Sequence, residues 1–241
     1  MNTTSPIVVT PAQILSSNSA TTPITDLGTR ASTRDGREYA YVQAGAAPLV
    51  TGNVLQAAAP VVLLHNMVVA AAAAGSTLLS ITSGATTAPA NTYAGGWLVV
   101  STGAGLGYVL SVQSHAEILS AAAFALLLTS DDALPVALTA ASRVDLIANP
   151  HKGVIQAPAT LTGAVVGVAV YPIAANEYGW AQKRGVGGVL VDGTPAIGQA
   201  VSPSGTVPGA AAINAGTSIM LGTMLVTGIG GRVQAVNLNI A

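Results

Sequence analysis

Short apolar segments separated by turn residues run through almost the whole chain, and they limit the folds open to it. Roughly a dozen such segments, rich in Val, Leu, Ile and Thr, recur about every 8–15 residues. Gly, Pro, Ser and Asp separate them. The spacing predicts an all-β fold, which we expect to be an antiparallel β-sandwich or barrel of the jelly-roll kind.

The positions of the expected strands follow from these segments. A hairpin is predicted over 28–45, because Asp35-Gly36 tolerates the positive φ of a tight turn. Strand pairs are predicted over 95–113, around a glycine-rich turn, and over 124–139. Single strands are predicted at 48–56, 61–65, 78–82, 142–147, 158–172, 196–201, 218–222 and 231–240. Two alanine runs, 70–74 and 121–123, lack helix caps and are predicted to be loop or strand-adjacent.

Two segments repeat a pattern of aromatic residues. Residues 38–43 read Glu-Tyr-Ala-Tyr-Val-Gln, and residues 177–182 read Glu-Tyr-Gly-Trp-Ala-Gln. Aromatic side chains two residues apart on a strand share one face. They pack either in a core or at a subunit interface, and both interpretations stay open. The candidate subunit interface consists of Tyr39, Tyr41, Tyr178, Trp180, Lys183 and Arg184, with the last two placed to form ion pairs across it.

Charged residues are scarce. They make up 7% of the chain, with a formal net charge of −1, against roughly 25% in ordinary soluble proteins. The surface is therefore expected to be uncharged polar or covered by other protein, which favours a component of an assembly. Without a basic surplus we expect no nucleic-acid partner. The most apolar stretch, 60–75, is interrupted by His65 and Asn66, so we expect no membrane span.

We divide the chain into an extended N-terminal arm, residues 1–27, and one β-rich domain, residues 28–241. The arm is rich in Thr, Ser and Pro, with a short β-branched run between two prolines. It is either a disordered tail or an arm that adds a strand to a neighbour's sheet. The binding segment would be Ile7, Val8, Val9 and Thr10. The charges that follow, between Arg30 and Glu38, form either a solvated face or a docking patch for an acidic partner.

No catalytic, metal or cofactor site is predicted. Gly103-Ala-Gly-Leu-Gly107 lacks the third glycine and the following helix of a dinucleotide fingerprint. His65, His115 and His151 are isolated from one another, without metal-ligand spacing. Adjacent Asp131 and Asp132 lie in a polar turn. We therefore expect a protein that is not an enzyme.

The order of these features resembles the head decoration (cement) proteins of tailed bacteriophages. The resemblance rests on the polar N-terminal arm, the 34–45 hairpin, Asn-Pro-His-Lys-Gly at 149–153 and Tyr-Gly-Trp-Ala-Gln-Lys-Arg-Gly at 178–185. It implies a virion protein on the outer capsid surface, a homotrimer that braces the major capsid protein. The alternatives are another β-rich virion subunit, or a carbohydrate-binding or hydrolytic β-sandwich in which Trp97 or Trp180 stacks on sugar.

Overall fold

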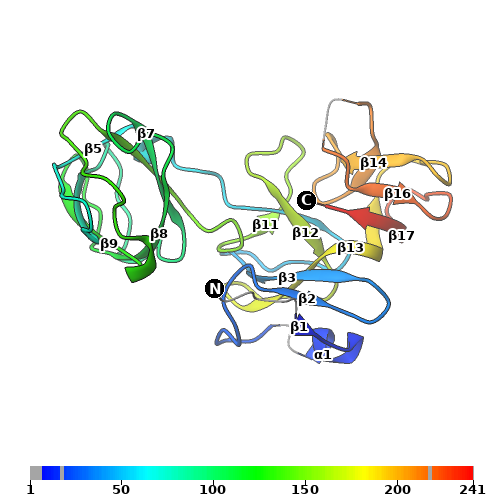
Figure 1. Ribbon diagram of the computed structural model, residues 1–241. Coiled ribbons are helices and arrows are strands. Elements are labelled where there is room, and N and C mark those ends of the chain that lie inside the picture. Colours follow the sequence, from blue (N-terminus) through cyan, green and yellow to red (C-terminus); the bar gives the residue numbers. More distant parts are fainter. Residues whose placement is uncertain (1–6, 17–18, 217–218, 241) are drawn as a thin grey trace. The chain divides into compact units, whose positions relative to one another are not determined.

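The computed structural model describes residues 7–16, 19–216 and 219–240 (Figure 1). The all-β prediction is confirmed, with 41% strand and 5% helix. We expected a single domain over 28–241, and the contacts instead form two compact units. Residues up to 59 and from 150 onward make the first, here called the main unit, and residues 60–149 make the second, here called the inserted unit.

The inserted unit occupies the connection between two neighbouring strands of the main unit. Strand β4 (Val54–Gln56) pairs antiparallel with β11 (Ile155–Gln156), so that Gln56 lies opposite Ile155. In most antiparallel neighbours a short hairpin loop would join these ends. Here the chain builds a complete second unit before it returns.

The inserted unit is a closed six-stranded barrel in the order β10-β5-β6-β9-β8-β7, with every neighbouring pair antiparallel. Alternate residues point inward, as in β9, where Phe124, Leu126 and Leu128 are buried in the barrel core. The glycine-rich turn between β7 and β8 is confirmed. The strand predicted at 61–65 is wrong, because that segment forms a 3-10 turn. The elements are η1 (Val62–Leu64), β5 (Met67–Val69), β6 (Leu78–Thr82), β7 (Trp97–Thr102), β8 (Val109–His115), β9 (Ala123–Leu128), η2 (Ser130–Asp132) and β10 (Arg143–Ile147).

The main unit is organised around one long strand, β13 (Tyr178–Val191). Its first half pairs with β3 and β12, its second half pairs with β17, and Val191 at its end pairs with β15. All strands of this unit join one 11-stranded sheet. The remaining strands are β1 (Ile7–Val8), β2 (Arg30–Ser32), β3 (Glu38–Gln43), β12 (Val165–Ala169), β14 (Ala200–Pro203), β15 (Ala211–Ile213), β16 (Gly222–Met224) and β17 (Arg232–Asn239).

Part of this sheet closes on itself. The pairings run from β13 through β15, β14, β16 and β17 and back to β13. Inward-facing aliphatic side chains, including Val189, Val191, Val236 and Leu238, fill its core. They follow the period of two that one buried strand face requires.

The N-terminal segment lies on the main unit. Strand β1 runs parallel to β2, with Ile7 opposite Ala31. A short helix, α1 (Pro11–Ser16), follows, and its Ile14 is buried to 2% exposure against aromatic side chains of the unit. Residues 7–16 are thus packed on their own chain, unlike the extended arm that we expected.

Candidate functional site

The two aromatic segments lie side by side. Strands β3 and β13 pair antiparallel, with Tyr41 opposite Trp180 and Gln43 opposite Tyr178. Tyr39, Tyr41 and Trp180 are buried in one cluster with Ile14, and Tyr178 is half-buried against it. The three buried rings belong to the core of the main unit. They have no surface to offer a second subunit, so of the six candidate interface residues only Tyr178, Lys183 and Arg184 remain accessible.

Ring geometry and one hydrogen bond fix the centre of this cluster. The rings of Tyr41 and Trp180 meet edge to face, with centroids 4.9 Å apart, and Tyr41 stacks on Tyr178 at 6.1 Å. The Tyr41 hydroxyl accepts a hydrogen bond from the Ile24 amide at 3.2 Å. A buried phenol needs such a partner, because an unsatisfied hydroxyl costs free energy in a core.

Lys183 and Arg184 lie at a β-bulge in β13. Gln182 pairs with Tyr39 and Arg184 pairs with Glu38, so Lys183 is the extra residue between two consecutive pairs. The Gln182 side-chain amide donates to the carbonyls of Arg184 and Val186, at 2.9 and 3.0 Å, and holds the bulge. Bulges re-aim side chains, often beside functional sites. The twofold alternation of the strand is broken at this point.

The bulge borders a hollow of about 200 Å³, here called the basic hollow. Its lining consists of Arg30, Glu38, Tyr39, Lys183, Arg184 and Ile240. Arg184 is held by two contacts: its guanidinium lies 3.6 Å from the Glu38 carboxylate, and its Nε donates to Asn239 Oδ1 at 3.1 Å. Arg30 and Lys183 are 153 positions apart in the sequence, and pairing of β2, β3 and β13 brings them to one hollow.

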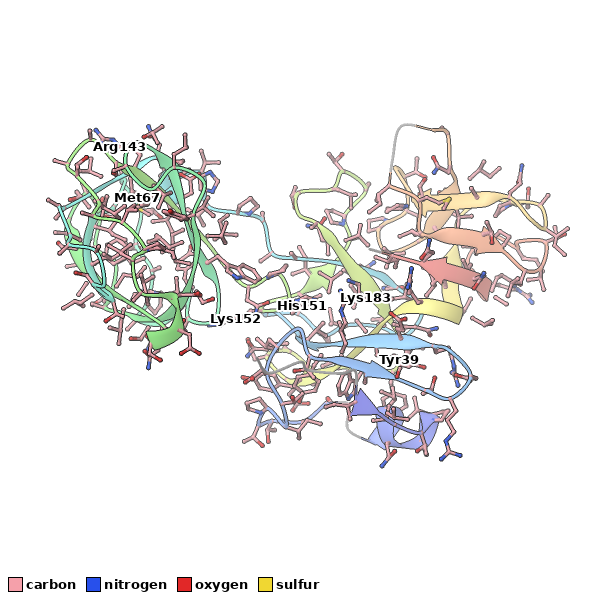
Figure 2. The ribbon with its side chains drawn as sticks, viewed as in Figure 1. Tyr39, Met67, Arg143, His151, Lys152 and Lys183 are labelled. Carbon is pink, nitrogen blue, oxygen red and sulfur yellow. The ribbon has the colours of Figure 1, made fainter. Side chains whose placement is uncertain are left out.

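Positive charge is concentrated around the basic hollow. Burial lowers the pKa of Lys183, and the nearby charge of Arg30 lowers it further, while Glu38 opposes this effect. Burial, followed by the charges of Lys183 and Arg30, lowers the pKa of His151 from 6.5 to about 4. Figure 2 shows Lys183, His151 and Tyr39 in the main unit. His151 is therefore neutral at pH 7, and the lysine and arginines carry the positive charge.

A second hollow, of about 220 Å³, lies beside the N-terminal segment. Its lining is mainly apolar and includes Pro11, Ile14, Leu15, Tyr39, Val186 and Val233. The predicted capsid-binding segment, residues 7–10, immediately precedes the lining residue Pro11 in the sequence. Ile7 and Val8 are exposed on β1, Val9 is half-buried, and Thr10 caps α1 through its hydroxyl, which accepts from the Gln13 amide at 3.2 Å.

The histidines do not converge. His115 is buried in the barrel of the inserted unit, where Nε2 accepts the Tyr93 amide at 2.9 Å and Nδ1 lies 2.7 Å from the Ala116 carbonyl oxygen. Within the described ranges, no three His, Asp or Glu side chains are grouped as a metal site requires. No helix among those residues is long and apolar enough to cross a membrane.

Trp180 is not exposed to sugar. It is 3% exposed, whereas stacking on a glycan requires an open ring face. Trp97 is half-buried on β7.

Comparison of the chain with known protein families, curated proteins and solved structures finds no match.

Proposed function

We propose that this protein is a non-enzymatic decoration protein of a tailed-phage head. It binds the outer capsid surface as a homotrimer and stabilises the lattice of the major capsid protein. The observation that carries the proposal is a surface that combines few charges with many exposed aliphatic side chains. Depletion of charged side chains is typical of surface that another protein covers.

Exposed aliphatic residues occur on both units. In the inserted unit Val62 is 74% exposed, and Leu106 and Leu78 are also open to solvent. In the main unit Val8 and Ile197 are exposed to a similar degree. Only 17 of the 241 side chains are Lys, Arg, Asp or Glu (8 plus 9), so little charge is available to keep such a surface dispersed.

Strand β1 supplies a specific contact for the capsid. It is the terminal strand of the sheet order, and in the described residues its only strand partner is β2. Backbone N–H and C=O groups on the other edge of a terminal strand can pair with a strand of another chain. The N-terminal segment thus acts as the sheet edge that receives a capsid strand, through Ile7, Val8, Val9 and Thr10.

The test is co-sedimentation of the purified protein with heads assembled from the major capsid protein of the same genome. Saturable binding, with a higher melting temperature of the decorated heads, supports the proposal. Absence of binding overturns it. If the protein sediments as large assemblies without heads, it is instead another self-assembling virion subunit.

Two variants isolate the contribution of β1. Val8→Asp places a charge on an exposed position and is expected to weaken head binding at least tenfold without changing the fold. Ile14→Ala empties a buried position instead and is expected to destabilise the main unit by about 2–5 kcal/mol. Deleting the segment would combine both effects. Equal head binding by Val8→Asp and wild type would remove β1 from the interface.

A further inference from the structure

We infer that the basic hollow of the main unit is a binding site for a single oxyanionic group, a carboxylate or a phosphate. Arg30 and Lys183 supply the charge, and Arg184 supplies a positioned guanidinium. The anion comes either free from solution or on an acidic side chain of a protein partner. The second source rests on the proposed function, whereas the site itself does not.

Positive charge exceeds negative charge at the hollow. Its lining contains three cations and one carboxylate, Glu38, which already lies against Arg184. Arg30 and Lys183 form no ion pair with any residue that the structure describes. The exposed Arg30 and the half-buried Lys183 therefore face one cavity, in which Glu38 is the one lining carboxylate to offset three cations. An incoming anion would satisfy both, with charge-assisted hydrogen bonds that are stronger than neutral ones.

Other carboxylates of the main unit are engaged elsewhere. Asp35 pairs with Arg37 at 2.7 Å, and Asp192 accepts the hydroxyls of Ser204 and Thr206 at 2.6 Å. Glu177 accepts the Ser19 hydroxyl. The fold thus pairs these acids locally and leaves the hollow positive. Burial is the main cause of the lowered pKa of Lys183, and the charge of Arg30 lowers this pKa further.

A structural irregularity of the fold lies at this position. A regular β13 would keep Lys183 in register, but the bulge takes it out of the pairing with β3. Gly185 follows the bulge at φ +80°, and the Gln182 side-chain amide bridges the bulge. The Lys183 carbonyl accepts the Ile240 amide at 2.9 Å, which anchors the backbone under the side chain. The cation is therefore presented on a fixed element.

Size limits the ligand class. The hollow measures about 200 Å³, below the roughly 300–1,000 Å³ of sites for drug-sized ligands. It holds one carboxylate or phosphate with a few waters, each of about 30 Å³. A nucleotide or an oligosaccharide would extend beyond it.

The experiment titrates inorganic phosphate, and separately acetate, into the isolated protein at constant ionic strength, followed by amide chemical shifts. We expect a saturable shift around Lys183, Gly185 and Ile240, with a dissociation constant on the order of 1 mM for phosphate. Lys183→Gln and Arg30→Gln should each weaken binding at least tenfold. Unsaturated or uniformly distributed shifts with both anions would overturn the site.

Arg232→Gln is the matched control. It removes the same charge from the same unit, at an exposed position near the opposite end of β17 from Asn239. It should leave the phosphate affinity unchanged, and an equal loss in this variant would mean that net charge alone attracts the anion. Circular dichroism of each variant verifies folding. Because Arg30 is on β2 and Lys183 on β13, a folding defect in one variant leaves the other as the test.

The source of the anion is decided by head binding. If a partner's acidic side chain occupies the hollow, Lys183→Gln loses head affinity and phosphate competes with heads for the wild-type protein. If the occupant is a free anion, Lys183→Gln loses phosphate affinity and binds heads normally. Wild-type protein that binds phosphate but no heads would refute the decoration function and support the anion site.

Discussion

Gln56 and Ile155 are direct partners across β4 and β11, although the whole inserted unit separates them in the sequence. Near the ends of that unit, the Asn66 amide donates to Asp145 Oδ1 at 2.6 Å. In the main unit, the two points at which the chain leaves and returns therefore lie close together. The two ends of the inserted unit also lie close together.

Because the ends meet, each unit is expected to fold without the other. Residues 60–149 expressed alone should form the barrel, and the main unit should fold when a short Gly-Ser turn joins residue 59 to residue 150. Far-UV circular dichroism and dispersed amide spectra measure this. The control is a fragment of the same length whose two ends are displaced along the sequence by half the length of the inserted unit. It should remain unfolded. Two unfolded excised units would contradict the division.

Tyr41 is expected to contribute to stability through packing more than through its hydroxyl. Tyr41→Ala removes a fully buried ring and should cost the main unit about 3–5 kcal/mol. Tyr41→Phe removes only the hydrogen bond from the Ile24 amide and should cost about 1 kcal/mol. Urea unfolding followed by Trp180 fluorescence, in a Trp97→Phe background, measures both. Equal costs would show that the hydrogen bond dominates.

Gly185 should tolerate no side chain. A Cβ there would lie 2.9 Å from Arg37 Cγ and 3.1 Å from its Cα, and the φ of +80° strains any L-residue. Gly185→Ala is expected to destabilise the main unit by about 1–3 kcal/mol. Gly193→Ala is the matched control, since Gly193 has a φ of +75° with nothing within 4 Å. Gly193→Ala should lose only the stability that corresponds to conformational strain, about 1 kcal/mol. An equal loss in the two variants would exclude the contact with Arg37 as a cause of the destabilisation.

Stability should fall with acid because of His151. Its folded-state pKa of about 4 lies below the ordinary 6.5. The unfolded chain therefore binds the proton more readily, and stability is lost as pH falls from about 6.5 to about 4. Allowing for partial exposure, the loss is about 1–2 kcal/mol. His151→Gln should reduce this loss, measured as the difference in urea midpoint between neutral and acid conditions. An unchanged pH dependence would contradict the assignment.

Several strands could be predicted because their local chemistry agrees with the fold; the second strand predicted within 124–139 does not form, since η2 follows β9 and the next strand is β10. Residues 142–147 alternate polar and apolar, and β10 buries Val144 and Leu146 in the barrel. The hairpin around Asp35-Gly36 forms as its turn residues require. The repeated Glu-Tyr pattern marks two strands that are direct neighbours.

Other features were harder to predict from the sequence. The boundary at residue 60 carries no change of composition, because the same Ala-, Val- and Thr-rich sequence runs through both units. Helix α1 had a readable signal that we missed: Thr10-Pro11-Ala12-Gln13 is a capping box with proline in the first turn. Its two reciprocal bonds form, at 2.7 and 3.2 Å. The sequence indicates Lys183 as a candidate interface residue. The basic hollow could not be predicted, since the bulge depends on the register between distant strands.

The place of the barrel also bears on the order of folding. Pairing of β4 with β11 must close a loop that contains all of residues 60–149. The entropic cost of closure grows with the logarithm of the length of flexible chain. A barrel that has already folded, with its two ends held near each other, replaces that flexible chain by a short connection. Folding of the inserted unit first is therefore expected to accelerate the last long-range pairing of the main unit, and every strand of the barrel precedes β11 in the order of synthesis.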